Sequence, residues 1–566
     1  MTTNAAAPSR HEAGTDPVAG SRQASQSLPA ADDDVPLTPR QVRLVAAGLL
    51  LGMLVAALNL TTVTPALPRI VAELGGLEHY SWVIMGATLT AAVVVPAVGK
   101  LGDLFGRKPF LIGGLVLFMA ASVLSGTAQS FWWLVAARIV QGVGMGAVMP
   151  LSQAIIGDIA PPRERGKYQG LIGSAFGIAS VSGPPLGGWI AEQFSWRWLF
   201  FVNLPVGLVA LWFIVQHMKL PHVQRAARID YAGFATLTLG LLALLLATTW
   251  GGNEYPWMSA PVLSLYAGGA FLLGLFLATQ RRSPEPVIPL YLWRNPVFAA
   301  ASVASLALAM AMFGAIAFVP MFAQGVLGLS VASSGFLLIP LELLLMVVSI
   351  ANGYLIARTG QYKPQMLVGL PLMGLGFFLL RRLTPSAGMA PLALYVACIG
   401  AGLGTSLHTY MLVVQNAVRR SDLGVASGAV QFARNVGSTL GVALVGTIMN
   451  SALRRTLPRH LPAGVAVDGL LPSEASGSGS VAALFEPASL AALPPEVVAG
   501  IRTALWEAYQ PVFGALLVFV MMAFAATVLL KALPLGARDP GNEVRESSGR
   551  APARAGDAEM VTTRRP

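Results

Sequence analysis

The chain contains fourteen apolar stretches that are each long enough to cross a lipid bilayer, and this repetition restricts the fold more than any other feature. A membrane-spanning helix needs roughly 20 residues at a rise of 1.5 Å per residue. We therefore predict an all-α integral membrane protein with fourteen transmembrane helices. The expected spans are 43–66, 81–98, 109–127, 132–154, 169–190, 199–216, 231–249, 260–278, 298–320, 334–356, 365–381, 391–413, 426–449 and 509–531.

The composition excludes several other classes of protein. Of the 566 residues, 55% are hydrophobic and 11% are charged, against about 25% charged in a typical soluble domain. The net charge of +11 is not a nucleic-acid patch, because the basic residues are spread over short loops between spans. The lone Cys398 excludes an intramolecular disulfide and a cysteine metal site. No metalloprotease, hydrolase or nucleotide-binding motif occurs, so we expect no metal, no cofactor and no enzymatic activity.

The distribution of lysine and arginine predicts the orientation in the membrane. If the N-terminus lies inside, most basic residues fall in the inner loops and tails, as the positive-inside rule requires. Both termini are then cytoplasmic. The polar segments 1–42 and 532–566 are predicted to be disordered tails, the first because it is rich in Ala, Ser, Pro and Asp.

An internal repeat divides the chain into two halves. The segment 99–109 (GKLGDLFGRKP) recurs as 353–364 (GYLIARTGQYKP), and Gly166 and Gly170 recur as Gly424 and Gly428. Two parallel halves around a central cavity suit alternating access. The predicted units are an N-terminal six-helix half (43–216), a two-helix insertion with its flanking loops (217–297), and a C-terminal six-helix half (298–531) with a long outer loop (450–508).

Four motifs follow one another in the N-terminal half: segment 99–109, then 138–144 (RIVQGVG), 183–188 (GPPLGG) and 196–205 (WRWLFFVNLP). With these motifs, the chain resembles the fourteen-helix drug:proton antiporter branch of the major facilitator superfamily over about residues 43–450. The resemblance implies the major facilitator fold. It also implies export of small amphiphilic substrates across the bacterial inner membrane in exchange for protons.

The first motif is the predicted inner gate. By resemblance, Asp103, Arg107 and Asp158 form a charge network that closes the inner side in the outward-facing state. Asp103 can accept hydrogen bonds from a helix N-terminus or from an arginine, and glycines permit a tight turn and close helix approach. The alternative is a solvated basic loop that only sets topology. The predicted gate residues are Gly99, Asp103, Gly106, Arg107, Lys108, Asp158, Arg163 and Arg165.

The third motif combines Pro184, which kinks a helix, with Gly183, Gly187 and Gly188, which permit close packing. By resemblance it is the hinge or seal that keeps an antiporter from leaking. Ordinary packing of small residues is the alternative interpretation.

Glu342 is the only acidic residue that we place well inside a predicted span. An ionisable group in hydrocarbon is costly and therefore marks a functional site. With Arg138 and Arg434, also within predicted spans, it indicates a polar pathway. Asn59 stands where the family usually has an acid, and an amide cannot carry a proton. Glu342 at similar depth is therefore the candidate proton carrier, with Arg138 or Arg434 as its partner.

Several alternatives remain open from the residues alone. Glu342 can instead reach a backbone or serine donor and only pack, Arg138 can snorkel outward, and His408 is more often a satisfied polar contact than a proton relay. The cargo can be a lipid, metabolite or peptide, and one buried acid against two buried arginines suits a neutral or anionic compound. The coupling ion can be sodium, and a non-transporting receptor or scaffold is a further class. The outer loop is a linker or, without direct support, a docking site for a periplasmic adaptor.

Overall fold

The computed structural model describes residues 38–76, 79–218, 229–251, 255–256, 258–461, 494–533 and 535, and the regular elements in this part of the chain are helices. The helices of the N-terminal half are α1 (Pro39–Val63), α2 (Leu67–Leu74), α3 (Trp82–Phe105), α4 (Arg107–Gly126), α5 (Phe131–Ile159), α6 (Arg165–Gln193), α7 (Trp198–Phe201) and α8 (Asn203–His217). The inserted helices are α9 (Tyr231–Trp250) and α10 (Ala260–Gln280).

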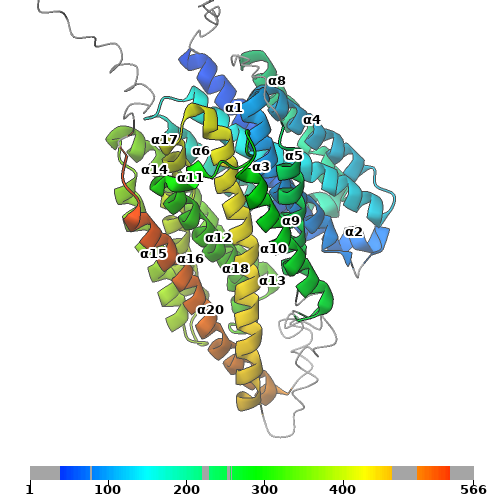
Figure 1. Ribbon diagram of the computed structural model, residues 1–566. Coiled ribbons are helices and arrows are strands. Elements are labelled where there is room, and N and C mark those ends of the chain that lie inside the picture. The colour runs from blue at the N-terminus through cyan, green and yellow to red at the C-terminus, as the bar shows by residue number, and fades with distance from the viewer. Residues whose placement is uncertain are drawn as a thin grey trace, which may run out of the picture.

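The C-terminal half begins after the short helix α11 (Tyr291–Arg294) and contains eight elements that are longer than one turn (Figure 1). They are α12 (Pro296–Gly325), α13 (Val331–Phe336), α14 (Leu338–Thr359), α15 (Lys363–Arg382), α16 (Met389–Ser406), α17 (Thr409–Ala417), α18 (Leu423–His460) and α20 (Pro495–Leu529). Both ends of the described chain lie at the same end of the bundle (Figure 1).

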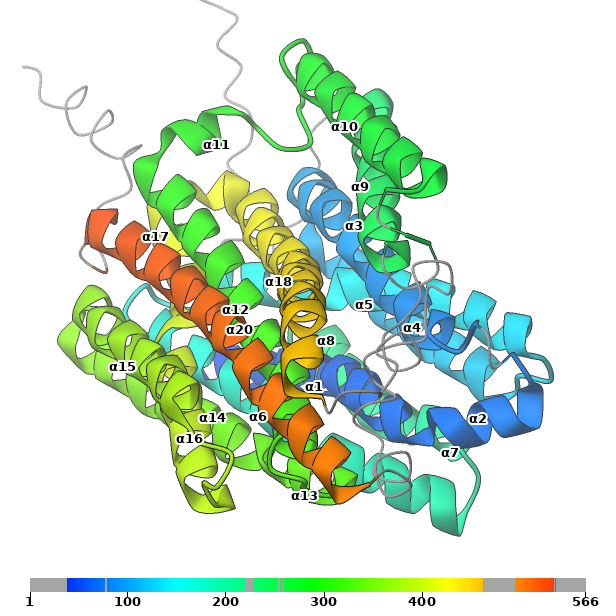
Figure 2. The ribbon, with the colours of Figure 1, turned by 90° about the horizontal axis from the view of Figure 1, so that it is seen from below.

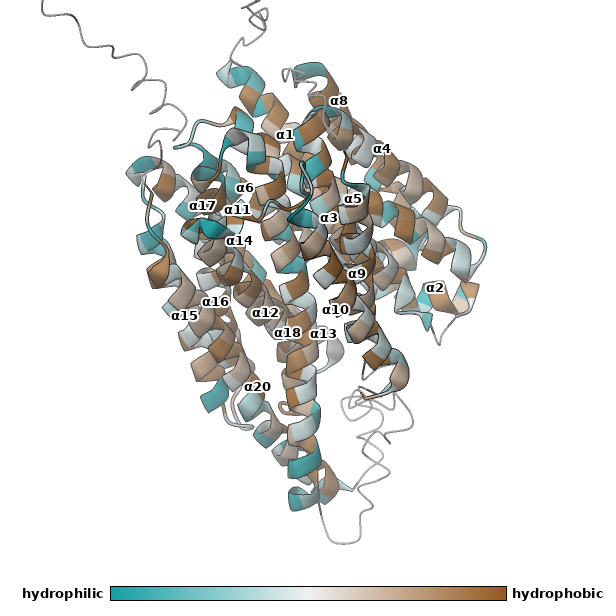
Figure 3. Cartoon of the chain, in the orientation of Figure 1, coloured by the Kyte–Doolittle hydropathy of each residue, from teal (hydrophilic) through white to brown (hydrophobic). Residues whose placement is uncertain are grey.

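Thirteen segments within the described residues are long and apolar enough to cross a membrane. The one predicted span missing from these thirteen is 169–190, which corresponds to α6; this helix is 29 residues long and packs between α1 and α14. Its many glycines and serines lower its hydropathy, because an interior helix in close contact with two neighbours needs small side chains. Apolar residues dominate the middle of the helices and polar ones gather toward their ends (Figure 3). The protein is an integral membrane protein.

Each half has a hydrophobic core of its own. Two clusters of buried residues are built from α1–α8, and a larger one is built from α11–α20. A smaller cluster joins α9 and α10 to the side of α3, with Phe432 of α18 packed against it. The inserted pair therefore lies at the edge of the bundle beside α3 (Figure 2), and α9 contacts both halves.

Several helices differ from the expected spans. The first span begins at Pro39, where Thr38 forms a capping box with Gln41, and it is interrupted at Thr64–Ala66. The span predicted at 391–413 is broken around His408 into α16 and α17. The sequence does not predict these two interruptions, because the residues on both sides of each break are apolar.

The outer loop is shorter than the predicted 450–508. Helix α18 continues to His460, and α20 begins at Pro495, where a Pro-Pro-Glu sequence predicts a helix start. The two extensions pack on each other: Thr456 donates to the Ala504 carbonyl at 2.9 Å, and His460 contacts Glu507 at 2.7 Å. Residues 462–493 and nearly all of both predicted tails lie outside the described residues.

Candidate functional site

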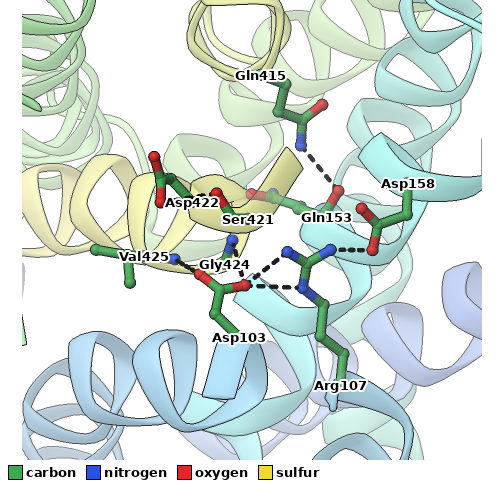
Figure 4. A network of polar contacts seen from close by, with 9 residues as sticks. All are labelled: Asp103, Arg107, Gln153, Asp158, Gln415, Ser421, Asp422, Gly424 and Val425. Atoms are coloured by element: carbon green, nitrogen blue, oxygen red, sulfur yellow. Dashed lines mark hydrogen bonds and ion pairs between the residues drawn. The ribbon is translucent and has the colours of Figure 1, made fainter. Parts of the chain in front are cut away.

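The carboxylate of Asp103 connects the two halves at one end of the bundle, which we call the gate end (Figure 4). Its Oδ1 accepts from the Gly424 amide at 3.0 Å and its Oδ2 from the Val425 amide at 2.8 Å. These amides belong to the first turn of α18, whose free N–H groups and dipole favour a negative charge. An acid in α3 of one half therefore caps a helix of the other half.

Arg107 holds this carboxylate in place. Its Nη2 donates to Asp103 Oδ1 at 2.6 Å and its Nε to the same oxygen at 3.1 Å, while Nη1 pairs with Asp158 at the end of α5. The Asp103 side chain is 5% exposed. The bonds predicted among these three residues are present. The network also binds the N-terminus of α18, and the sequence motif did not predict this contact.

The repeated glycines form two matched crossings between the halves. A Cβ on Gly99 would lie 2.7 Å from the Gly424 carbonyl oxygen, where α3 crosses α18. A Cβ on Gly353 would lie 2.5 Å from the Gly166 carbonyl oxygen, where α14 crosses α6. Both distances are shorter than real Cβ contacts, so each crossing requires glycine. The gate end is therefore closed by two crossings, and only the first carries a carboxylate, since Ala357 replaces Asp103 in the repeat.

Gln415 of α17 makes a second polar connection that we did not predict from the sequence. Its Nε2 donates to the Gln153 carbonyl at 2.8 Å, and its Oε1 accepts from Gln169 at 3.2 Å. Arg165 donates to the Gln415 carbonyl at 3.3 Å. The sequence feature that could have identified this residue is a glutamine within the apolar run of 409–417, because polar side chains in spans commonly bond across helices.

The remaining predicted gate residues have different roles. Gly106 has φ +91°, a conformation that favours glycine, at the turn between α3 and α4. Lys108 donates to the Met218 carbonyl at 2.5 Å, at the end of α8 in the same half. Lys363 in the repeat binds the Leu530 carbonyl at 2.6 Å in the same way. Arg163 is exposed and has no described hydrogen bond, so it does not join the network.

The glycine-proline motif of α6 packs on α1, not on the other half. A Cβ on Gly187 would overlap the Thr62 carbonyl oxygen, and one on Gly183 would overlap the Thr61 side chain. Thr61 also donates to the Ala179 carbonyl at 2.9 Å. Gly188 faces open space, so including it among the packing glycines was wrong. Pro184 is exposed within α6.

Arg138 is completely buried in the N-terminal half, which excludes outward snorkelling. Its Nε donates to the Val83 carbonyl at 2.9 Å, and Nη1 donates to Gln141 at 2.7 Å and to Asn59. The guanidinium also lies 5.9 Å from the Phe200 ring. Its Nη2 has no partner in the described structure. All of its acceptors are neutral, so the positive charge is not compensated by a carboxylate.

Glu342 lies on α14 where this helix contacts α6, and it is 7% exposed. Its carboxyl group lies close to the hydroxyl of Ser180 in α6, in the opposite half. It pairs with neither Arg138 nor Arg434, so the expected ion pair is absent. A serine contact is what we expected if Glu342 only packs. This contact, however, lies between the two halves. At 1.5 Å per residue, Glu342 lies about 26 Å from the gate end of α14.

Arg434 of α18 is 9% exposed, and no hydrogen-bond partner is described for it. The neighbouring titratable group is His408, at the break between α16 and α17. Neither ring nitrogen of His408 has a hydrogen-bond partner among the described residues. Buried donors of this kind, without partners, indicate a place where water or a ligand binds.

Comparison with known families decides the classification. The family model described as Major Facilitator Superfamily matches residues 49–442. The chain belongs to this superfamily. As a member of a family of transporters, the protein is a transporter and not an enzyme.

Relatives in the superfamily cover most of the chain. It is 34% identical to the multidrug transporter protein MdtP of Bacillus subtilis, over 87% of this chain and 93% of that one. It is 31% identical to multidrug resistance protein 3 of the same organism, over 86% and 94%. It is 37% identical to the uncharacterised MFS-type transporter Rv1877 of Mycobacterium tuberculosis, over 88% of this chain and 71% of the relative.

Solved structures show the same fold at low sequence identity. The human organic anion transporter MFSD10 matches with a TM-score of 0.57 and 16% identity, over 86% of this chain and all of that one. The proton:xylose symporter XylE matches with a TM-score of 0.54 and 14% identity, over 87% and 96%. The protein therefore has the major facilitator fold, with two additional helices, α9 and α10, between its halves.

Replacing Asp103 by asparagine should open the gate end. The change removes charge-assisted bonds to Arg107 and to the N-terminus of α18, and one such bond contributes about 1.5–3 kcal/mol. We expect the closed-to-open ratio to fall by about 10- to 150-fold, at 1.4 kcal/mol per factor of ten. Accessibility labelling at the gate end measures this ratio. Asp158→Asn is the control, because Asp158 contacts Arg107 within one half and should have a smaller effect.

Proposed function

We propose that this transporter exports amphiphilic, drug-like compounds across the bacterial inner membrane in exchange for protons. The names of two relatives above 30% identity, a multidrug transporter and a multidrug resistance protein, support drug efflux. In this proposal the two halves alternate between a state closed at the gate end and a state open there. In this proposal, the crossings of α3 with α18 and of α14 with α6 correspond to the outward-facing state.

The orientation in this proposal places the gate end and both termini in the cytoplasm. The concentration of lysine and arginine in loops at this end supports it. The ends of α1 and α20 that lead into the two tails share this side (Figure 1). A protease or membrane-impermeant label added to right-side-out vesicles should therefore leave both tails unmodified.

The observation that carries proton coupling is the position of Glu342 on the contact between halves. A carboxyl group on this surface lies against Ser180 while α14 and α6 are together. In this proposal the movement of one half against the other changes the surroundings of this contact between the two states. The carboxyl group thereby meets two different environments in the two states, which is what a proton carrier in alternating access needs.

The charge of the buried residues favours a second candidate cargo, an anionic amphiphile. Arg138 and Arg434 are buried without a carboxylate partner among the described residues, and Glu342 lies beside a neutral hydroxyl. An anionic group would compensate these charges, whereas a cationic drug would meet net repulsion. Asn59 stands in the position where the family usually has an acid, and the missing negative charge also favours an anionic cargo.

A transport assay in proteoliposomes separates the two cargo classes. Cationic and anionic fluorescent amphiphiles of similar size are compared under the same imposed proton gradient, with wild type and Arg434→Gln. Export of the anionic probe that is reduced in the variant supports the second candidate. Preferred export of the cationic probe, unaffected by the variant, contradicts it and leaves the first. Ligand binding without flux of either probe would contradict transport altogether.

A further inference from the structure

A small polar cavity lies between the halves, directly beside the crossing of α14 with α6. It is bordered by α6 from the N-terminal half and by α14, α17 and the break before α17 from the C-terminal half. It leaves about 10 Å³ for the centre of a water-sized sphere, and one water needs roughly 10–15 Å³ on this measure. Its polar wall is formed by Gln169, Asn352, His408, Ser349 and Thr409.

Three of these side chains have polar atoms without a partner in the described structure. They are Oε1 of Gln169, Oδ1 of Asn352 and both ring nitrogens of His408. The three residues are 2%, 5% and 2% exposed, so bulk solvent does not reach them. Leaving a buried polar atom unpaired costs about 1–3 kcal/mol. An empty cavity would therefore destabilise the closed arrangement of the two halves several times over.

The orientation of both amides is determined by their nitrogen atoms. Gln169 Nε2 donates to Gln415 at 3.2 Å, and Asn352 Nδ2 donates to the Thr405 carbonyl at 3.0 Å and to Thr409 at 3.1 Å. The oxygens are therefore the atoms left for the cavity. Two acceptors and one imidazole, which has one N–H and one acceptor nitrogen when neutral, match the hydrogen-bonding capacity of a single water molecule.

We propose that this cavity binds one water molecule that joins the two halves in the closed state. The water donates to Gln169 Oε1 and to Asn352 Oδ1, and it accepts from the His408 N–H. Of the residues it binds, Gln169 belongs to one half and Asn352 and His408 to the other. The site is complete only when α6 lies against α14, so the bound water forms an uncharged latch in addition to the ionic gate at Asp103.

A metal cation fits the cavity less well than water. No carboxylate lines it, and the guanidinium of Arg434 is the charged neighbour of His408. A larger ligand is excluded because the volume holds one molecule of the size of water. Gly170 and Gly353, which also border the cavity, allow the two backbones to approach closely enough to enclose it.

A double-mutant cycle tests the latch in the full-length chain. Spin labels at Arg163→Cys and Arg358→Cys, in a Cys398→Ser background, report the distance between halves at the gate end. His408→Leu should shift the population toward the open gate by about two- to tenfold, the range for one lost hydrogen bond. Gln169→Leu should shift it further, because it also removes the direct bond to Gln415. Because one water serves both residues, the double variant should shift it no further than the larger single effect.

Two further measurements keep the test decisive. Ser427→Ala is the control, because Ser427 is buried with an unpartnered hydroxyl outside this cavity, and it should leave the distance distribution unchanged. A structure of the unmodified protein at a resolution that reveals ordered water should show one peak between Gln169, Asn352 and His408. Multiplicative effects in the double variant, or a cavity without density, would overturn the proposal.

Discussion

Glu342→Gln should abolish gradient-driven export and leave exchange of substrate down its own gradient. Glutamine keeps the shape of the side chain and its ability to bond to Ser180, but it cannot ionise. If Glu342 carries the proton, accumulation of substrate in inverted vesicles should fall to the level measured without a proton gradient. Counterflow of labelled against unlabelled substrate should persist, because the pathway and the gate are unchanged.

Ser180→Ala separates this account from a packing role for Glu342. It removes the neutral partner and leaves the carboxyl group intact, so coupled export should be largely retained. If Glu342 only packs against α6, both variants should instead have similar, mild effects on export. Full proton-coupled export by Glu342→Gln would sink the proton-carrier role and direct attention to Asp103, Asp158 or His408.

Gly187→Val should eliminate transport, whereas Gly188→Val should preserve it. Valine at 187 places carbon atoms on the Thr62 carbonyl oxygen of α1, while the same residue at 188 enters open space. Overpacking of this kind costs about 1–3 kcal/mol, and α1 and α6 must move apart to accommodate the valine. The two variants have the same side chain in adjacent positions of one helix, so their difference reports the contact and not helix propensity.

The measurement is substrate flux per folded protein, with the folded fraction taken from size-exclusion chromatography and the thermal midpoint recorded for both variants. If the Gly187→Val protein inserts, remains monodisperse and transports at the wild-type rate, the motif has no role in transport. Equal impairment by both variants would show that the effect comes from valine in this helix and not from the close contact with α1.

Much of the fold follows from the sequence, because long apolar runs and a repeated loop motif are local signals. The repeat that relates Gly99 to Gly353 and Gly166 to Gly424 predicted two halves. The structure explains the repeat by pairing Gly99 with Gly424 and Gly353 with Gly166. The sequence could not predict this exchange of partners, since it depends on how one half sits against the other.

The candidate site was predicted only in part for the same reason. The bonds among Asp103, Arg107 and Asp158 involve residues of one motif and one helix end, and they were anticipated. The surroundings of Glu342 and Arg434 depend on side-chain direction across a helix interface, which residue spacing within one span does not fix. Hence the expected ion pairs are absent, and Gln415 and the cavity near His408 emerged only from the structure.

Substrate-induced proton release tests proton-coupled export most directly. Purified protein in weakly buffered detergent solution is mixed with a saturating exported compound, and a pH-sensitive dye follows the free proton concentration. Because proton and substrate alternate on one carrier, wild type should release protons when substrate binds, and Glu342→Gln should bind substrate without release. Substrate binding to wild type with no proton release, or with release only when sodium is present, would contradict the account.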